Sequence, residues 1–212
     1  MSDLSKSEGY LTLCKRGSDR FEEKRSQFIG YAIPIITESE ALDFIEEIRK
    51  KHSDATHNVY AYTLRKNNIC RYSDDGEPQG TAALPVLDVL KKGEICDACI
   101  VVTRYFGGTL LGAGGLVRAY SKAAKIAVDD AGVGRMQPLV RFYILAEYSD
   151  LGKIERECEA YSARIINTEY ADKIKITLSI PQKRYEDFCL RIVDISAGKL
   201  NAVFEDVYHS IL

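Results

Sequence analysis

The last third of the chain carries the most regular pattern of apolar and polar positions. Residues 174–180 alternate between the two kinds of position, which predicts a strand with one buried face. Residues 164–169 follow a similar alternation, and residues 171–173 between them predict a turn. Pro181 then opens a predicted helix that ends at Gly198. Its apolar residues recur at helical spacing and are Tyr185, Phe188, Cys189, Ile192 and Val193.

The flanking segments complete a six-element order. Residues 139–148 are rich in aromatic and β-branched residues, which predicts a strand. Ser149 and Asp150 are expected to cap a following helix, and residues 202–208 read as a last strand. The order βαββαβ is the ferredoxin-like arrangement.

The first part of the chain is less regular but also mixes strands and helices. Strands are predicted over residues 10–16, 28–36, 59–64 and 98–105, and helices over residues 38–52, 81–90 and 116–128. Thr37 is the expected cap of the first helix, and the unbroken apolar run before Tyr105 predicts a strand buried on both faces. Two glycines and a proline within residues 132–138 predict a linker. We therefore expect an α/β (α+β) protein with domains at residues 1–134 and 135–212.

Composition places the chain among globular proteins of the cytoplasm. Apolar residues make up 46% and charged residues 28%, and no run of eighteen apolar residues predicts a membrane span. The N-terminal residues lack the apolar stretch of a signal peptide. In a reducing cytosol, the six cysteines are expected to be free thiols.

The charge balance argues against a strongly basic nucleic-acid binder. The net charge is −2; residues 1–135 hold 19 basic and 19 acidic residues, and the remainder holds 10 and 12. Non-specific binding to nucleic acid depends on an excess of Lys and Arg that neutralises phosphates. The balance therefore counts against a histone-like binder, although a local basic face could still exist.

Three segments of the first domain are not explained by core packing. They are ATHN (55–58), YSDDGEPQGT (72–81) and RYFGGTLLGAGGLVRAY (104–120). The third contains five glycines within nine residues, at a cost in backbone entropy. Such density indicates a need for backbone freedom or for close approach by another group.

The stretches SDDGEPQGTA and RYFGGTLLGAGGLVRAYS resemble the signature segments of the IMPACT/YigZ family, and EKRSQFI and ATHNVYAY fit the same pattern. The resemblance is strongest over residues 10–131. It implies an N-terminal domain like domain 2 of ribosomal protein S5 and a C-terminal domain similar to the ferredoxin-like domains of elongation factor G. Eukaryotic members of the family are linked to regulation of translation, and the resemblance carries over no settled biochemical activity from the bacterial members.

The glycine-rich segment has the physical design of an anion site. Backbone N–H groups at a glycine-rich helix start point toward an anion, and Arg118 lies one turn in. The segment lacks GxxxxGK[ST], however, and GAGGLV departs from GxGxxG at its last position, so a purely structural turn is the alternative. The residues expected to contact a ligand or RNA are Ser73, Asp74, Asp75, Glu77, Arg104, Tyr105, Gly107, Gly108, Gly112, Gly114, Gly115 and Arg118.

Other candidate chemistry is weaker. The carboxylates of the 74–77 turn could bond local backbone, pair with Arg104 or Arg118, or hold a divalent metal at Asp74 and Asp75. His57 could act as a general base, although a lone His at a strand start is more often structural. The Cys96–Cys99 pair lacks the second pair that zinc normally needs.

Two functions follow as hypotheses. The preferred one is a non-enzymatic binding protein, without a cofactor, that regulates translation through RNA, the ribosome or a translation-associated protein. The alternative is an enzyme or sensor that binds a small phosphorylated ligand at the glycine-rich loop, with Asp74 or Asp75 holding magnesium and His57 assisting proton transfer.

Overall fold

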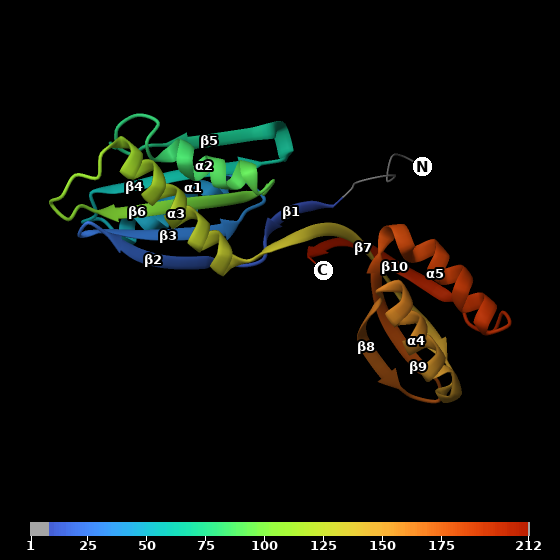
Figure 1. Ribbon diagram of the computed structural model, residues 1–212. Helices are drawn as coiled ribbons and strands as arrows, with labels where there is room; N and C mark the ends of the chain where they lie inside the picture. The colour runs from blue at the N-terminus through green and yellow to red at the C-terminus, as the bar shows by residue number, and fades with distance from the viewer. Residues whose placement is uncertain (1–8, 212) are drawn as a thin grey trace. The chain divides into compact units, whose positions relative to one another are not determined.

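The computed structural model describes residues 9–211, which form two compact units, one from Tyr10 to Arg135 and one that begins at Met136 (Figure 1). The first eight residues, where we expect no signal peptide, lie outside the described part. No described helix is long and apolar enough to cross a membrane.

The first unit has three layers. Its elements are β1 (Tyr10–Leu13), β2 (Gly17–Glu23), β3 (Ser26–Pro34), α1 (Glu38–Lys51), β4 (His57–Leu64), β5 (Ile69–Ser73), α2 (Ala83–Lys92), β6 (Ala98–Tyr105) and α3 (Ala113–Ala131). The order β2-β3-β6-β4-β5 describes an antiparallel sheet. Helix α1 packs on one face of this sheet, and α2 and α3 pack on the other.

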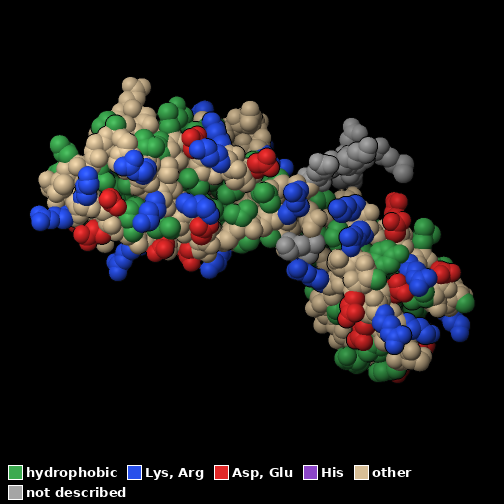
Figure 2. Space-filling view, in the orientation of Figure 1, with side chains coloured by type: hydrophobic (Ala, Val, Ile, Leu, Met, Phe, Trp, Pro, Cys, Tyr) green, Lys and Arg blue, Asp and Glu red, His purple; other side chains and the backbone are tan. Residues whose placement is uncertain are grey.

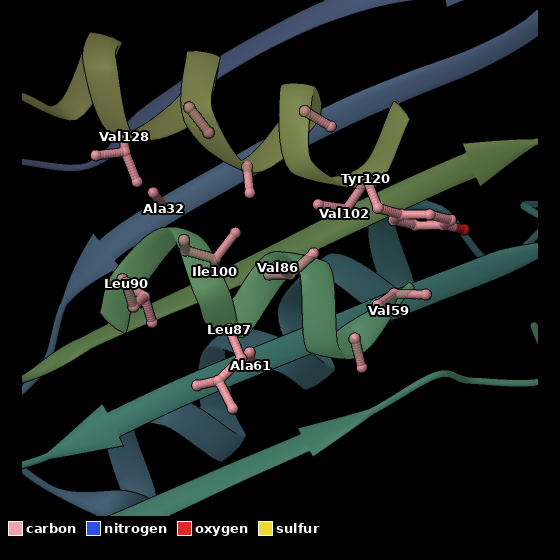
Figure 3. Packing of buried hydrophobic residues seen from close by; sticks show 14 of the residues in the cluster. Ala32, Val59, Ala61, Val86, Leu87, Leu90, Ile100, Val102, Tyr120 and Val128 are labelled. Atoms are coloured by element: carbon pink, nitrogen blue, oxygen red, sulfur yellow. The ribbon is translucent and has the colours of Figure 1, made fainter. Parts of the chain in front are cut away.

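Strand β6 lies at the centre of the sheet and carries an apolar run because helices cover both of its faces. Ile100 and Val102 face α2 and α3 (Figure 3), whereas Cys99 and Val101 face α1. Because both faces are covered, both sets of alternating side chains are buried, as the sequence predicts.

The second unit contains β7 (Val133–Ala146, which starts before Met136), α4 (Leu151–Tyr161), β8 (Arg164–Tyr170), β9 (Ile174–Pro181), α5 (Gln182–Ile195) and β10 (Ala202–Ile211). Strand β7 pairs with β9 and β10, and β9 pairs with β8, all antiparallel; β1 also pairs with β7, whose first residues belong to the first unit, so the sheet has five strands. Alternate residues of β7 and β9 form one core with both helices. The predicted mixed α/β class and the βαββαβ order are confirmed.

Several local predictions need correction. The segment predicted as a linker, residues 132–138, belongs mostly to β7, because β10 extends to Ile211 and supplies partners as far as Met136. Strands β2 and β5 were not predicted, since their sequences, GSDRFEE and ICRYS, lack a long apolar pattern. Helix α3 begins at Ala113, inside the glycine-rich segment.

The two predicted helix caps differ in outcome. Thr37 forms the expected cap, and with Glu40 it completes a reciprocal capping box. Asp150 occupies the N-cap position of α4 but makes no side-chain cap bond, and its carboxylate pairs instead with Lys153 at 3.0 Å.

Candidate functional site

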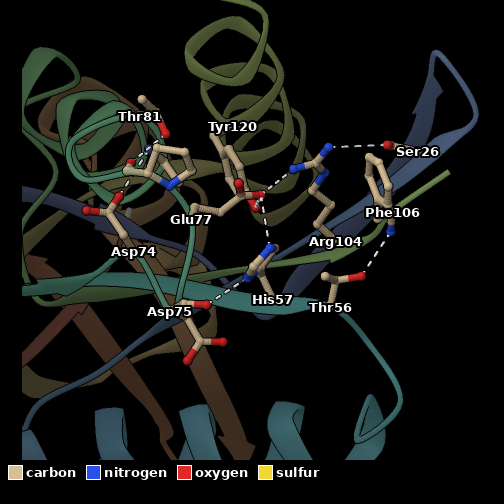
Figure 4. Close-up of polar contacts among 12 residues, drawn as sticks. Ser26, Thr56, His57, Asp74, Asp75, Glu77, Thr81, Arg104, Phe106 and Tyr120 are labelled. Carbon is tan, nitrogen blue, oxygen red and sulfur yellow. Dashed lines mark hydrogen bonds and ion pairs between the residues drawn. The ribbon is translucent and has the colours of Figure 1, made fainter. Parts of the chain in front are cut away.

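The three unusual segments meet at one end of the first sheet (Figure 4). His57 at the start of β4 pairs with Arg104 near the end of β6, because the two strands are antiparallel. The turn between β5 and α2 brings Glu77 to the same place, and the first turns of α3 bring Tyr120. Residues far apart in the chain therefore share one polar cluster.

Glu77 is the centre of this cluster. Its Oε1 accepts a hydrogen bond from Nη1 of Arg104 at 2.5 Å and another from the hydroxyl of Tyr120 at 2.7 Å. The side chains of Glu77 and Arg104 are only 3% and 5% exposed. A buried charge is costly unless it is paired and hydrogen-bonded, so this pair is mutually dependent.

Three other polar groups lie around the carboxylate of Glu77: the Tyr120 hydroxyl, Nε of Arg104 and the imidazole of His57. Burial and the hydrogen bond to Glu77 raise the pKa of the Tyr120 hydroxyl, which therefore remains a donor. Nε of Arg104 is buried and has no hydrogen-bond partner among the described residues. His57 lies beside the pair, with Nε2 3.8 Å from Glu77; its Nδ1 lies 2.8 Å from the carbonyl oxygen of Asp75, which can only accept a hydrogen bond.

The carboxylates of the two aspartates in the turn accept hydrogen bonds from backbone amides. The carboxylate of Asp74 accepts hydrogen bonds from the amides of Gly80, Ala82 and Ala83 at 2.9, 3.1 and 2.8 Å. That of Asp75 accepts from the amide of Asn58 at 2.6 Å and from Arg49 at 3.2 Å. Within residues 9–211, no group of three or more metal-ligating side chains is present.

The glycines of the third segment have different structural roles. A Cβ on Gly107 would lie 2.0 Å from the backbone of Arg25 in the β2–β3 turn, so only glycine fits there. Gly108 and Gly112 have φ values of +81° and +72°, which L side chains rarely adopt. A Cβ on Gly115 would press on Leu111 at 2.9 Å, whereas one on Gly114 would meet nothing closer than 3.8 Å.

The structure separates some of the predicted site residues. Tyr105 faces α1, and its hydroxyl lies 3.0 Å from Asp54 and 2.9 Å from His52. Ser73 accepts a hydrogen bond from the amide of Asp75. Glu77 pairs with Arg104, so neither side chain faces solvent. Arg118 is exposed and forms no ion pair with a described residue.

One exposed surface remains around the glycine-rich loop. We define the loop surface as Lys24, Arg25, Phe106, Leu110 and Arg118, all exposed. None of its three cations forms an ion pair within the described chain. Figure 2 shows Lys and Arg side chains at the end of this unit, interspersed with acidic and hydrophobic ones. Lys24 and Arg25 were not predicted as site residues; the signal was their place in the motif EKRSQFI.

The chain matches two protein-family models. Residues 24–128 match the Impact N-terminal domain, and residues 144–199 match a domain of unknown function (DUF1949). All three unusual segments lie inside the first match.

Similar proteins extend over most of the chain. "IMPACT family member YvyE" of Bacillus subtilis is 38% identical, covering 90% of this chain and 88% of its own length. "IMPACT family member YigZ" of Escherichia coli is 33% identical, with 84% and 89% covered. "Protein IMPACT homolog" of Dictyostelium discoideum is 37% identical over 42% of this chain and 27% of its own. A solved structure titled "Crystal structure of an hypothetical protein" matches with a TM-score of 0.59 and 31% identity, covering 94% of this chain and 98% of its own.

Proposed function

The chain belongs to the IMPACT family, and on this premise we propose that it is a non-enzymatic binding protein that regulates translation by contact with RNA or the ribosome. The contact is made by the loop surface. The observation that carries the proposal is the charge of Arg118, which forms no ion pair in the described chain and lies on the helix that follows the exposed Phe106 and Leu110.

The loop surface offers two kinds of contact to a nucleic acid, with its phosphates and with its bases. Unpaired cations attract phosphates and release counterions when they bind them. An exposed aromatic ring such as Phe106, which is 45% exposed, offers a face on which an unpaired base can stack. Helix α3 adds amides at its glycine start, where no side chain caps the helix.

The buried cluster supports this surface from beneath. Ser26 accepts hydrogen bonds from Arg104 and from the amide of Gly107, which ties the loop to the Glu77 pair. Arg104 and Glu77 therefore have a positioning role, and we do not assign them contact with the ligand. The same holds for Asp74, whose carboxylate holds the start of α2.

The alternative function, an enzyme or sensor for a phosphorylated small molecule, receives less support. It needs Asp74 or Asp75 to hold magnesium, yet both carboxylates already accept several hydrogen bonds. Binding a metal would cost those bonds and the backbone geometry that they hold.

Co-sedimentation with ribosomal subunits across a salt series tests the proposal. We expect binding at low salt that weakens as salt rises, and Arg118→Gln should lower the logarithmic salt slope by about 1. Because Arg118 is exposed, this variant should fold normally, which its melting temperature would verify.

Lys66→Gln is the matched control. Lys66 is also exposed and without an ion pair in the described chain, but it follows β4 at the end of the sheet opposite His57. Equal loss in both variants would mean that binding depends on overall charge only. Protein that stays at the top of the gradient at low salt would overturn the proposal.

A further inference from the structure

A cavity of about 310 Å³ lies in the second unit, away from the glycine-rich loop in the sequence. It is lined by Gln137, Ser162, Arg164, Pro181, Lys183 and Arg184. We propose that this cavity binds a phosphate group. The proposal does not rest on the function assigned to the loop surface, because it concerns other residues in another unit.

The charges of the lining carry the proposal. Three of its six residues are cations, Arg164, Lys183 and Arg184, and none is acidic. None of the three forms an ion pair with any residue from 9 to 211. Arg184 donates a hydrogen bond from Nη1 to Ser162 at 2.9 Å, which holds its guanidinium at the cavity.

Most of the cations of the unit that lack an ion pair within the described residues lie at this cavity. Of the ten Lys and Arg residues after position 136, five form ion pairs: Arg141, Lys153, Lys173, Lys175 and Arg191. Three of the five without a described ion pair line this one cavity. The remaining two are Arg156 and Lys199.

Helix α5 reinforces the positive potential. It begins beside the cavity at Gln182, and no side chain caps its first amides. Its first turn contains no acidic residue and two of the cations, Lys183 and Arg184. Cations at a helix N-terminus oppose the helix dipole, so this arrangement is unfavourable until an anion occupies it.

A phosphate fits this environment better than a carboxylate does. A phosphate dianion balances two of the three positive charges and offers several acceptor oxygens, and Arg164 and Arg184 can each bind it through two donors. A carboxylate would balance only one charge. The cavity volume lies within the range of small-ligand sites, about 300–1,000 Å³.

A titration of the full chain with inorganic pyrophosphate, followed by amide NMR spectra, tests the site. We expect saturable shifts of the Lys183 and Arg184 amides. Arg164→Gln and Lys183→Gln should each weaken binding about tenfold, since each removes a charge-assisted contact. Arg156→Gln and Lys199→Gln are matched controls that should bind as the unmodified chain does, because they lie outside the cavity.

A second titration with a short single-stranded RNA identifies the source of the phosphate. Shifts of the same amides, reversed by pyrophosphate, would indicate an RNA backbone. Binding of pyrophosphate without RNA would indicate a free phosphorylated molecule. The absence of saturable shifts at α5, or equal loss in the cavity and control variants, would overturn the proposal; the spectra themselves show whether each variant is folded.

Discussion

Arg104 and Glu77, which lie 27 positions apart in the chain, form a buried ion pair with 2.5 Å between Nη1 and Oε1. Tyr120 donates to the same carboxylate oxygen, and Ser26 links the guanidinium to the glycine-rich loop. The cluster thus connects the folded core to the proposed binding surface. We therefore expect its disruption to lower the free energy of unfolding.

Arg104→Ala should lower the free energy of unfolding by roughly 3–5 kcal/mol, because it leaves the Glu77 carboxylate buried without its partner. Equilibrium urea unfolding measures this loss. The double variant with Glu77→Ala should cost clearly less than the sum of the single variants. Arg71→Ala on β5, exposed and without an ion pair in the described part, is the control and should change stability by less than about 0.5 kcal/mol. A small effect of Arg104→Ala would contradict the structural role.

Two glycines of the same segment should respond in opposite directions. Gly107→Ala should lower stability by roughly 1–3 kcal/mol, because the new methyl group would meet the Arg25 backbone. Gly114→Ala should raise it by about 0.5–1 kcal/mol, since this position is helical and has space. Thermal unfolding of both variants measures the difference. Equal effects would mean that the β2–β3 turn does not constrain the loop.

Acidification should destabilise the first unit through His52. Burial, and then the charge of Lys51, lower the pKa of His52 from its usual 6.5, while Asp54 opposes the shift. The unfolded chain therefore takes up a proton first as the pH falls below about 6.5, and the free energy of unfolding falls until the folded state is also protonated.

Melting temperatures of the unmodified chain and of His52→Gln between neutral and acidic pH test this expectation. The variant should be less stable at neutral pH, since it disturbs the contacts with Tyr31 and Tyr105, but should lose less stability on acidification. His209→Gln on β10, an exposed histidine, is the control and should follow the unmodified chain. Parallel pH profiles for all three proteins would mean that protonation of His52 does not cause the loss of stability at acidic pH.

The cysteines should differ in reactivity. Burial raises the pKa of Cys99, and burial with the nearby charges of Glu155 and Glu157 raises that of Cys158 to about 11. Both thiols should therefore resist iodoacetamide at neutral pH, whereas the exposed Cys14 should react. Mass spectrometry after brief labelling distinguishes them, with a urea-unfolded sample as the control for full labelling. Rapid labelling of Cys99 in the folded chain would show that β6 opens readily.

Much of the fold could be predicted because it depends on short-range pattern. The alternation of residues 174–180, the helical spacing after Pro181 and the capping by Thr37 each involve residues a few positions apart. Strand β2 could not be recognised in this way. Its residues are mostly polar, and they form a strand because β3 supplies the hydrogen bonds.

The family and the three segments that build the site could also be recognised from the sequence, because unusual composition such as the glycine-rich run is visible without a structure. Three relationships are visible only in the folded chain: the carboxylate that pairs with Arg104, the direction of Tyr105 away from the cluster, and the three scattered cations that line one cavity. The physical reason is that these relationships depend on strand pairing and helix packing between distant residues. Their geometry is set by the whole core and not by neighbouring positions in the chain.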